Sequence, residues 1–400
     1  MVYISVLGYG TVGSGVVEVL KQNKDVIAAQ AGQEIEVKYV LDLRDFPNDP
    51  IQEKIVHDFD IILNDPEVQL VAEVLGGIEP AYTYTAQALR AGKSVVTSNK
   101  ELVARHGAEL VSIAEANKVS FLFEASVGGG IPIIRALHTS LTADHITDIL
   151  GILNGTTNYI LTRMYEEGAQ FEDVLAQAQA FGYAERNPSA DVDGFDAGRK
   201  IAILSSIVNG RFVDFEDIYT EGITKISAED IQYIKKMNLN IRLLAGAKRN
   251  ENGVYAFVSP FLLEKTHPLY NVNDVFNAVY LNSDMLGETM FYGKGAGKLP
   301  TASAVVSDIV DTVKHQNAFI HMNLQPDHMQ LLDFDTFECP FFVRVKQEDL
   351  EEAKKVFPVE AVIESLIESE AGFLTERMTQ KAFHEAAEKL EIINRIRFYR

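Results

Sequence analysis

Residues 2–21 read VYISVLGYGTVGSGVVEVLK. The first six are mostly apolar or β-branched, which is typical of a strand buried in a parallel sheet, and the apolar spacing after residue 13 is helical. Between them the glycines have G-x-G-x-x-G spacing. This permits a tight turn, close approach of the backbone to a pyrophosphate, and helix–strand packing. The stretch favours a Rossmann-type dinucleotide site over a plain glycine turn, with cofactor contacts at Gly8, Gly10, Thr11, Val12 and Gly13.

The second predicted strand, residues 34–43 (EIEVKYVLDL), bears on which dinucleotide binds. Asp42 lies near its end, where an acid usually bonds the ribose 2′-hydroxyl of NAD. Arg44 follows, and an arginine there accommodates the 2′-phosphate of NADP. Because both residues are present, the sequence leaves NAD and NADP open.

The next segments alternate strand and helix, as an α/β domain with a parallel sheet requires. Ligands of such sheets bind at the carboxyl edge, so Lys100, at the end of a predicted strand, is favoured as a functional residue over a solvated loop lysine. The predicted elements are a strand at 69–77, a helix at 81–93, a strand at 94–100, a helix at 101–118 and a strand at 119–126.

The composition excludes several classes of protein. With 400 residues, 47% of them hydrophobic, the chain is long enough for two or three domains with sizeable cores. A net charge of -21 without a long basic run argues against a nucleic-acid partner. The start enters a strand at once, and no apolar run reaches membrane-spanning length. A single cysteine, Cys339, cannot form an internal disulfide, so we expect a soluble cytoplasmic protein without a membrane partner.

A second stretch, residues 178–200, reads AQAFGYAERNPSADVDGFDAGRK. If a helix starts near Gly194, Asp196 and Lys200 lie one turn apart on the same face. The alternative is a solvated acidic loop followed by a surface ion pair. The apolar run IAILSSIV after Lys200 indicates a buried helix, however, and a buried lysine is costly unless it has partners. The stretch therefore predicts a site that holds an ammonium-bearing substrate and transfers a proton.

The pattern A-x3-G-Y-A-E-x-x-P-x2-D-V-x-G-x-D-x3-K in this stretch resembles the signature of homoserine dehydrogenase. The resemblance covers residues 1 to about 320. It implies reversible NAD(P)-dependent reduction of L-aspartate 4-semialdehyde to L-homoserine, a step towards threonine, methionine and isoleucine. It also implies a homodimer or higher homo-oligomer. The site residues that it implies are Lys200 as proton donor with Lys100 assisting, substrate contacts at Glu185, Asp196, Asp191 and Gly182, and cofactor contacts at Ser98, Lys100 and Gly297.

Residues 124–132 (EASVGGGIP) contain a glycine run beside one glutamate. From these residues alone a flexible turn is the better interpretation. The resemblance implies instead a monovalent cation, sodium in that family, with a structural role. Its ligands would be the Glu124 side chain and the carbonyls of Val127, Gly129 and Ile131.

From about residue 340 the pattern of elements becomes strand, helix, strand, strand, helix, strand, which is a ferredoxin-like order. The tail resembles an ACT module, but the D-x-P-G turn of many such modules is replaced by the acidic QEDLEE. We therefore expect a structural tail with weak or no threonine inhibition. The predicted fold is α/β, with a Rossmann domain at 1–131, an α+β catalytic and dimerisation domain at 132–320, and the ACT-like module at 330–400. Within the second domain, 299–315 would pack back on the first.

Two other functions are less consistent with the sequence. An aspartate-semialdehyde dehydrogenase needs a thiolate nucleophile, and the only cysteine, Cys339, lies far from the cofactor motif in sequence. A non-catalytic nucleotide sensor would explain the glycine turn and the tail. It would leave Glu185, Asp196 and Lys200 without a role.

Overall fold

The computed structural model describes residues 1–316 and 318–400, which divide into two compact units. Unit 1 comprises residues 1–143, 202–215 and 293–329, and unit 2 comprises residues 144–201, 216–292 and 330–400. Each unit thus combines segments that are far apart in the sequence. The division into domains at 1–131, 132–320 and 330–400 stays a prediction, since the units interleave those segments.

Unit 1 is built on a six-stranded sheet whose neighbouring strands all run parallel. Residues 2–7 form a central strand between β2 and β4. They are mostly apolar because this strand is buried on both faces. The order is that of a Rossmann fold, which confirms the predicted dinucleotide-binding architecture. In spatial order the strands are β3 (Ile55–Val56), β2 (Ile35–Leu41), β1 (Val2–Leu7), β4 (Val68–Glu73), β5 (Ser94–Thr97) and β6 (Phe121–Leu122).

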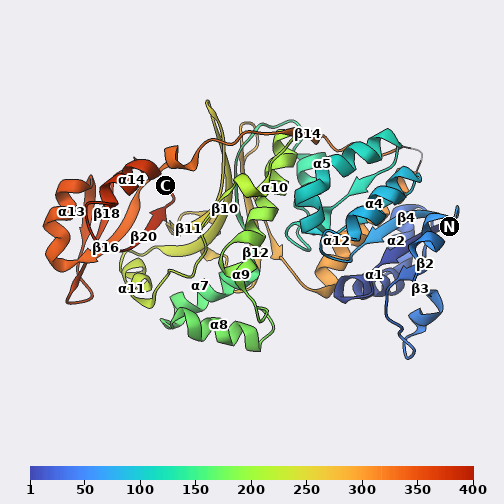
Figure 1. The fold of residues 1–400 in the computed structure, drawn as a ribbon, viewed down its shortest axis with the longest axis horizontal. Helices are drawn as coiled ribbons and strands as arrows, with labels where there is room; N and C mark the ends of the chain where they lie inside the picture. The colour runs from blue at the N-terminus through green and yellow to red at the C-terminus, as the bar shows by residue number, and fades with distance from the viewer. Residues whose placement is uncertain (317) are drawn as a thin grey trace. The chain divides into compact units, whose positions relative to one another are not determined.

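Helix α12 (Lys298–Lys314) lies directly against α1 (Thr11–Gln22), although nearly 300 residues separate them (Figure 1). Gly15 makes this approach possible, since a Cβ there would lie 2.9 Å from the Ala302 Cβ. The other elements of unit 1 are α2 (Lys24–Ala31), α3 (Phe59–Leu63), α4 (Ala81–Arg90), α5 (Lys100–Ala116), α6 (Ile133–Arg135), the turns η1 (Pro50–Lys54), η2 (Glu124–Ser126) and η3 (Ala136–Ser140), and the paired strands β8 (Arg211–Phe212) and β14 (Gln325–His328).

Unit 2 is built on a mixed ten-stranded sheet. Its longest pair, β10 (Asn240–Asn250) and β11 (Gly253–Leu263), is antiparallel and largely buried. The remaining strands are β13 (Gly287–Lys294), β12 (Phe276–Ser283), β7 (Ile146–Ile152), β9 (Tyr219–Thr220), β20 (Ile392–Phe398), β16 (Phe341–Lys346), β18 (Glu370–Thr375) and β17 (Val359–Ile363), with β15 (Glu338–Cys339) and β19 (Met378–Thr379) paired beside it.

The helices of unit 2 include the three over which the signature stretch 178–200 runs, α8, α9 and α10. Within residues 1–316 and 318–400, no helix has the length and apolarity that crossing a bilayer requires. The helices and turns are α7 (Gly155–Glu167), α8 (Phe171–Ala180), α9 (Ser189–Val192), α10 (Phe195–Asn209, which continues into unit 1), α11 (Ala228–Lys236), α13 (Leu350–Val356), α14 (Gln380–Ala387), η4 (Phe215–Asp217), η5 (Pro268–Asn271), η6 (Phe334–Thr336) and η7 (Gln347–Asp349).

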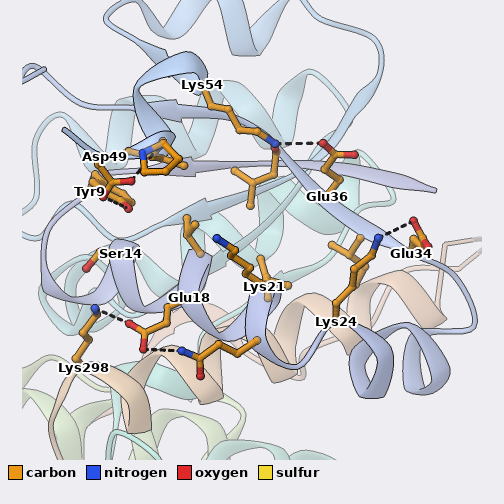
Figure 2. Close-up of a pocket in the computed structure, with 17 residues that line it drawn as sticks. Tyr9, Ser14, Glu18, Lys21, Lys24, Glu34, Glu36, Asp49, Lys54 and Lys298 are labelled. Atoms are coloured by element: carbon orange, nitrogen blue, oxygen red, sulfur yellow. Dashed lines mark hydrogen bonds and ion pairs between the residues drawn. The ribbon is translucent and has the colours of Figure 1, made fainter. Parts of the chain in front are cut away.

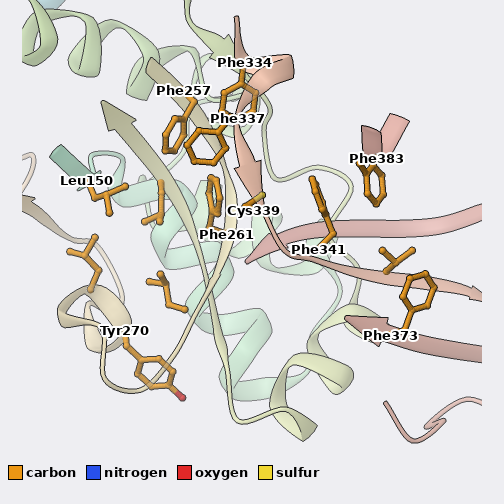
Figure 3. Close-up of a cluster of buried hydrophobic side chains, with 14 of the residues drawn as sticks. Leu150, Phe257, Phe261, Tyr270, Phe334, Phe337, Cys339, Phe341, Phe373 and Phe383 are labelled. Atoms are coloured by element: carbon orange, nitrogen blue, oxygen red, sulfur yellow. The ribbon is translucent and has the colours of Figure 1, made fainter. Parts of the chain in front are cut away.

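Residues 330–400, the terminal segment, continue the sheet of unit 2. Their strands lie in the order β20-β16-β18-β17, and β20 pairs parallel with β11, placing Arg397 opposite Phe261. One apolar core extends across this seam: Phe257 and Phe261 pack with Phe334, Phe337 and Phe341 of the terminal segment (Figure 3). The terminal segment and the sheet it joins therefore have to fold together.

The strand predicted at 119–126 is shorter in the structure. Only Phe121 and Leu122 pair with β5, and residues 124–126 form a turn. The Glu124 amide donates to Asp308 Oδ2 at 2.8 Å, and Ser126 turns back onto the carbonyl of Phe123. Residues 124–126 therefore make one bond to a distant residue, Asp308, and one bond within the turn, in place of strand pairing.

Phe341→Ala tests the shared core. Truncating this fully buried ring should lower the free energy of unfolding of unit 2 by about 3–5 kcal/mol. Calorimetry should show unit 2 melting as one transition at a lower temperature. The control is Val362→Ala, which removes a side chain that is 46% exposed in the same sheet and should change the free energy by less than about 0.5 kcal/mol. A separate early transition for the terminal segment would contradict the shared core.

Candidate active site

The glycine turn at residues 8–13 has the geometry that a pyrophosphate requires. Gly8 has φ +97°, and a Cβ at Gly13 would lie 1.9 Å from the Gly8 carbonyl oxygen, so both glycines are needed for the turn itself. A Cβ at Gly10, in contrast, meets no atom within 4 Å. Gly10 caps α1, so Thr11 and Val12 open the helix beside this open space, and the amides of a helix N-terminus favour a phosphate. The residues present therefore fit a dinucleotide.

Asp42 and Arg44 meet beside this turn. Asp42 Oδ2 accepts from the Tyr9 amide at 2.8 Å, and Arg44 Nε donates to Asp42 Oδ1 at 2.9 Å. The hydrogen bond from Arg44 is the largest cause that holds the pKa of Asp42 well below its usual range. Asp42 is mostly buried, whereas the Arg44 side chain is 63% exposed. The structure thus presents an ionised acid whose charge is balanced by an accessible guanidinium.

A groove of about 890 Å³ runs along α1 from this turn (Figure 2). Tyr9 lines the groove and donates from its hydroxyl to Asp49 at 3.0 Å; burial and this bond raise the pKa of Tyr9 to about 12. Three of the four lysines that line the groove pair with glutamates, and with Lys21 and Asp49 the lining has as many acidic as basic side chains, so it has little excess positive charge. The pairs are Lys298–Glu18 at 2.7 Å, Lys24–Glu34 at 3.2 Å and Lys54–Glu36 at 3.1 Å.

The strand predicted at 94–100 ends at Thr97 in the structure, so Lys100 is the first residue of α5 and follows the carboxyl end of β5 by three residues. Asn99 caps the helix through the Leu102 amide at 3.1 Å and donates to the Gly77 carbonyl at 2.6 Å. The neighbouring Ser98 amide bonds the carbonyl of Glu73 at 3.4 Å. Ser98 and Lys100 therefore lie at the edge of the parallel sheet where ligands of such folds bind.

The 293–297 loop meets the 124–131 turn within unit 1. A Cβ at Gly129, which has φ +54°, would lie 2.6 Å from the Gly295 carbonyl oxygen. Gly297 caps α12 with φ +120°, a conformation that other residues rarely adopt. Gly297 is thus required for entry into the helix that packs on α1.

The Glu124 carboxylate is already occupied by backbone donors. Its two oxygens accept from the amides of Ile134 at 2.9 Å and Arg135 at 2.6 Å. Arg135 also pairs with Asp308 at 2.5 Å. Burial raises the pKa of Glu124, and burial together with the Glu124 charge raises the pKa of Asp308 to about 7. The sequence predicts the Glu124 side chain as a cation ligand. In the structure both of its carboxylate oxygens bind backbone amides at the start of α6 instead.

In unit 2 the structure assembles an acid–lysine cluster of Asn154, Asp191, Asp196 and Lys200. Lys200 Nζ donates to Asp196 Oδ2 at 2.6 Å and to the Leu153 carbonyl at 2.7 Å. Asn154 Nδ2 donates to Asp191 Oδ1 at 2.7 Å and to Asp196 Oδ2 at 2.9 Å. Asp196 is 3% and Lys200 9% exposed, so these charges are held apart from bulk water by mutual pairing.

Glu185 and Gly182 are placed differently from the cluster. Both lie exposed on the loop after α8, and the Glu185 carbonyl accepts from Gln179 at 2.9 Å. Gly182 has φ +75° and its amide bonds the Gln179 carbonyl at 3.1 Å, which ends the helix. The structure therefore brings Asp191, Asp196 and Lys200 together but leaves Glu185 at the surface.

Sequence reasoning missed Asn154. Its side chain caps α7 by accepting from the Thr157 amide at 2.9 Å, and the same side chain donates to both aspartates. An asparagine followed by Gly-Thr-Thr at a strand end signals a helix cap. That signal contains nothing about the aspartates some 40 residues later.

The comparisons with known proteins agree with this arrangement. The homoserine dehydrogenase NAD binding domain matches residues 8–124, and the homoserine dehydrogenase family proper matches residues 132–310. A homoserine dehydrogenase of Pseudomonas aeruginosa is 38% identical to this chain, covering 98% of this chain and 96% of its own.

Solved structures of homoserine dehydrogenases are similar to this chain as well. A homoserine dehydrogenase from Thiobacillus denitrificans matches with a TM-score of 0.93 and 35% identity, covering 100% of this chain and 98% of its own. A hyperthermophilic archaeal homoserine dehydrogenase in complex with NADPH matches with a TM-score of 0.65 and 29% identity, covering 78% of this chain and 97% of its own. This chain belongs to the homoserine dehydrogenase family, NAD(P)-dependent oxidoreductases that act on a CH–OH group.

Proposed function

We propose that the acid–lysine cluster carries the proton transfer when L-aspartate 4-semialdehyde and L-homoserine are interconverted. The observation that carries this proposal is the buried Lys200 ammonium, which contacts Asp196 and the Leu153 carbonyl within 2.7 Å. Burying an ammonium is costly, and the chain supplies it with dedicated partners. Such an arrangement is typical of catalytic sites.

In reduction, Lys200 Nζ gives a proton to the aldehyde oxygen, and in oxidation it takes the proton from the hydroxyl of L-homoserine. The bound nicotinamide supplies or accepts the hydride at the carbon. Asp196, with Asp191, orients the lysine and holds polar groups of the substrate, including its ammonium. Lys100, at the sheet edge of unit 1, assists the proton transfer. Glu185 is a further substrate contact, and because it is exposed it would have to reach the substrate from the loop after α8. The reaction would be a step towards threonine, methionine and isoleucine.

Lys200→Met should lower kcat by roughly a hundredfold or more while leaving cofactor binding nearly intact, because it removes the proton donor. Lys200→Arg is the matched control for charge. A guanidinium keeps the positive charge beside Asp196 but does not give up its proton at neutral pH, so its kcat should also fall. Steady-state kinetics in both directions test this, and wild-type kcat in Lys200→Met would remove Lys200 from the mechanism.

Asn154→Ser should separate the two roles of Asn154. Serine is as good a helix cap, so the melting temperature should stay close to that of the wild type. The donor to Asp191 and Asp196 is lost, and the carboxylates should then repel each other and shift, lowering kcat/KM for homoserine by roughly tenfold, the value of about one hydrogen bond to a charged group. Equal kcat/KM in both proteins would show that the amide serves only as a cap.

For the cofactor we propose that the site accepts NADP or NAD and that Arg44 determines the relative affinity for the two. The exposed guanidinium would face a 2′-phosphate, while Asp42 would face a free 2′-hydroxyl. The archaeal relative solved with NADPH supports the first of these.

Arg44→Ala should weaken NADPH selectively and leave NADH affinity nearly unchanged. The change deletes the cation and uncovers the negative charge of Asp42, which repels a phosphate. Fluorescence titration with each cofactor measures the effect. An equal loss for both would show that Arg44 does not face the ribose.

A monovalent cation, sodium, remains part of the proposal, in a structural role. Residues 1–316 and 318–400 contain no cluster of His, Cys, Asp and Glu side chains that could hold a metal ion, so backbone carbonyls of the turn would have to supply the ligands. We assign them to Val127, Gly129 and Ile131. Glu124 would support the turn through its bonds to the amides of Ile134 and Arg135.

We further propose that the terminal segment is a ferredoxin-like, ACT-like module with a structural role. Its element and strand orders support this, and helix α13 begins almost directly after β16, where many ACT modules have a glycine turn. We therefore expect weak or no inhibition by threonine. By family resemblance the chain would act as a homodimer or higher homo-oligomer. Its single, buried free thiol at Cys339 supports a reducing compartment such as the cytoplasm.

A further inference from the structure

Glu221, one residue after β9, is held by two arginines of the terminal segment. Arg395 Nη1 lies 3.0 Å from each of its oxygens, and Arg397 Nη1 lies 2.5 Å from Oε2. The Tyr219 hydroxyl donates to the same oxygen at 2.8 Å. Burial acts to raise the pKa of Glu221, but the charges of Arg397 and Arg395 outweigh it and lower the pKa to about 2. The carboxylate is therefore ionised and firmly held at neutral pH.

Arg397 has a complete set of partners although its side chain is only 1% exposed. Nε donates to Gln380 Oε1 at 2.9 Å, Nη1 also to Ser259 Oγ at 2.6 Å, and Nη2 to the Tyr219 hydroxyl at 2.8 Å. Breaking a buried pair of this kind leaves an uncompensated charge, so the arrangement resists displacement. Glu221 is thereby fixed to the seam between β11 and β20.

The residues around Glu221 contact the turn at residues 192–194, which leads into α10. A Cβ at Gly222 would lie 2.1 Å from the Val192 carbonyl oxygen, and the Ile223 amide bonds that carbonyl at 2.8 Å. A Cβ at Gly194 would lie 3.1 Å from Thr220 Cγ2. The backbone of residues 222–223 therefore contacts the backbone of residues 192–193, and the Thr220 side chain packs against Gly194, so a shift of one segment must move the other.

The supported turn carries two members of the acid–lysine cluster: Asp191 precedes Val192, and Asp196 follows Gly194 by two residues. A misplacement of about 1 Å can cost a hundredfold in rate. We infer that Glu221 and Arg397, with Arg395, are positioning residues of the reaction. Through them the terminal segment holds the turn at 192–194, and with it Asp191 and Asp196, in the catalytic arrangement. This inference rests on the proposed role of Asp196 and Lys200.

Arg344 offers a matched control from the neighbouring strand β16. It is also nearly fully buried, at 3% exposure, and it pairs with Asp230 and Glu370 at 2.6 Å each. Its acidic partners lie in α11 and β18, whereas the contacts described between the 192–194 turn and residues outside 188–198 come from residues 220–223 and Val258. Arg344→Met should therefore destabilise unit 2 much as Arg397→Met does without moving the turn.

The test compares Glu221→Gln, Glu221→Asp, Arg397→Met and Arg344→Met in the full-length chain, at a temperature where circular dichroism shows each to be folded. Glu221→Gln and Arg397→Met should lower kcat/KM for homoserine roughly tenfold or more, while the Kd for NADPH stays within about twofold. Glu221→Asp, which keeps the charge, should recover part of the activity. Arg344→Met should retain kcat/KM within about threefold. Hydrogen exchange of peptides covering 192–196 should accelerate in Glu221→Gln and stay unchanged in Arg344→Met.

Three results would overturn the inference. One is wild-type kcat/KM in Glu221→Gln, which is nearly isosteric and keeps the assay valid if Arg397→Met fails to fold. Another is an equal loss in Arg344→Met. The third is unchanged exchange at 192–196 in Glu221→Gln. Lys200→Met, assayed in parallel, distinguishes failure of the proposed site from failure of the positioning role. Full activity in Lys200→Met refutes the proposed site. An inactive Lys200→Met beside a fully active Glu221→Gln refutes only the positioning role.

Discussion

The burial of the Lys200 ammonium is the constraint on which the functional part of unit 2 depends. An ammonium taken out of water needs a carboxylate and further acceptors, and here Asp196 and the Leu153 carbonyl supply them. Leu153 directly follows β7, and Asp196 lies in the first turn of α10, so Lys200 finds both partners only where the end of the strand approaches the helix. Asn154 joins them because it caps α7 and binds both aspartates.

The same requirement recurs at two other places, in each case between segments distant in sequence. In unit 1 the buried Asp308 of α12 is matched by Arg135 and by the amide of Glu124. In unit 2 Arg397 of β20 is matched by Glu221, Ser259 and Gln380. Because an unmatched buried charge is much more costly than a matched one, each cluster specifies a single arrangement of its segments. The buried ion pairs thus fix the relative positions of these segments more specifically than apolar packing does.

The terminal segment shows why element order alone describes a fold incompletely. Its six main elements follow the order that the sequence pattern predicts, which would suit an appended and separate domain. In the structure β20 extends the sheet through β11, and Phe257 and Phe261 share a core with Phe334 and Phe337. The phenylalanines of β11 and those of η6 and its cap are buried only if both sides of the seam are present. Removing residues 330–400 would expose this core and the edge of β11.

Local spacing by itself determined much of this protein. The G-x-G-x-x-G turn between β1 and α1 was readable because turn, strand and helix are set by residues within about 20 positions. The pairing of Asp196 with Lys200 was readable because residues four apart share a helix face. Only the tertiary structure decided that Asn154 joins this pair, that Glu124 binds the amides at the start of α6, that Glu185 lies exposed, and that Arg397 reaches Glu221. Each of these features depends on how separate elements pack or on how the chain folds back between them, and side-chain type and spacing along one element contain no information about that arrangement.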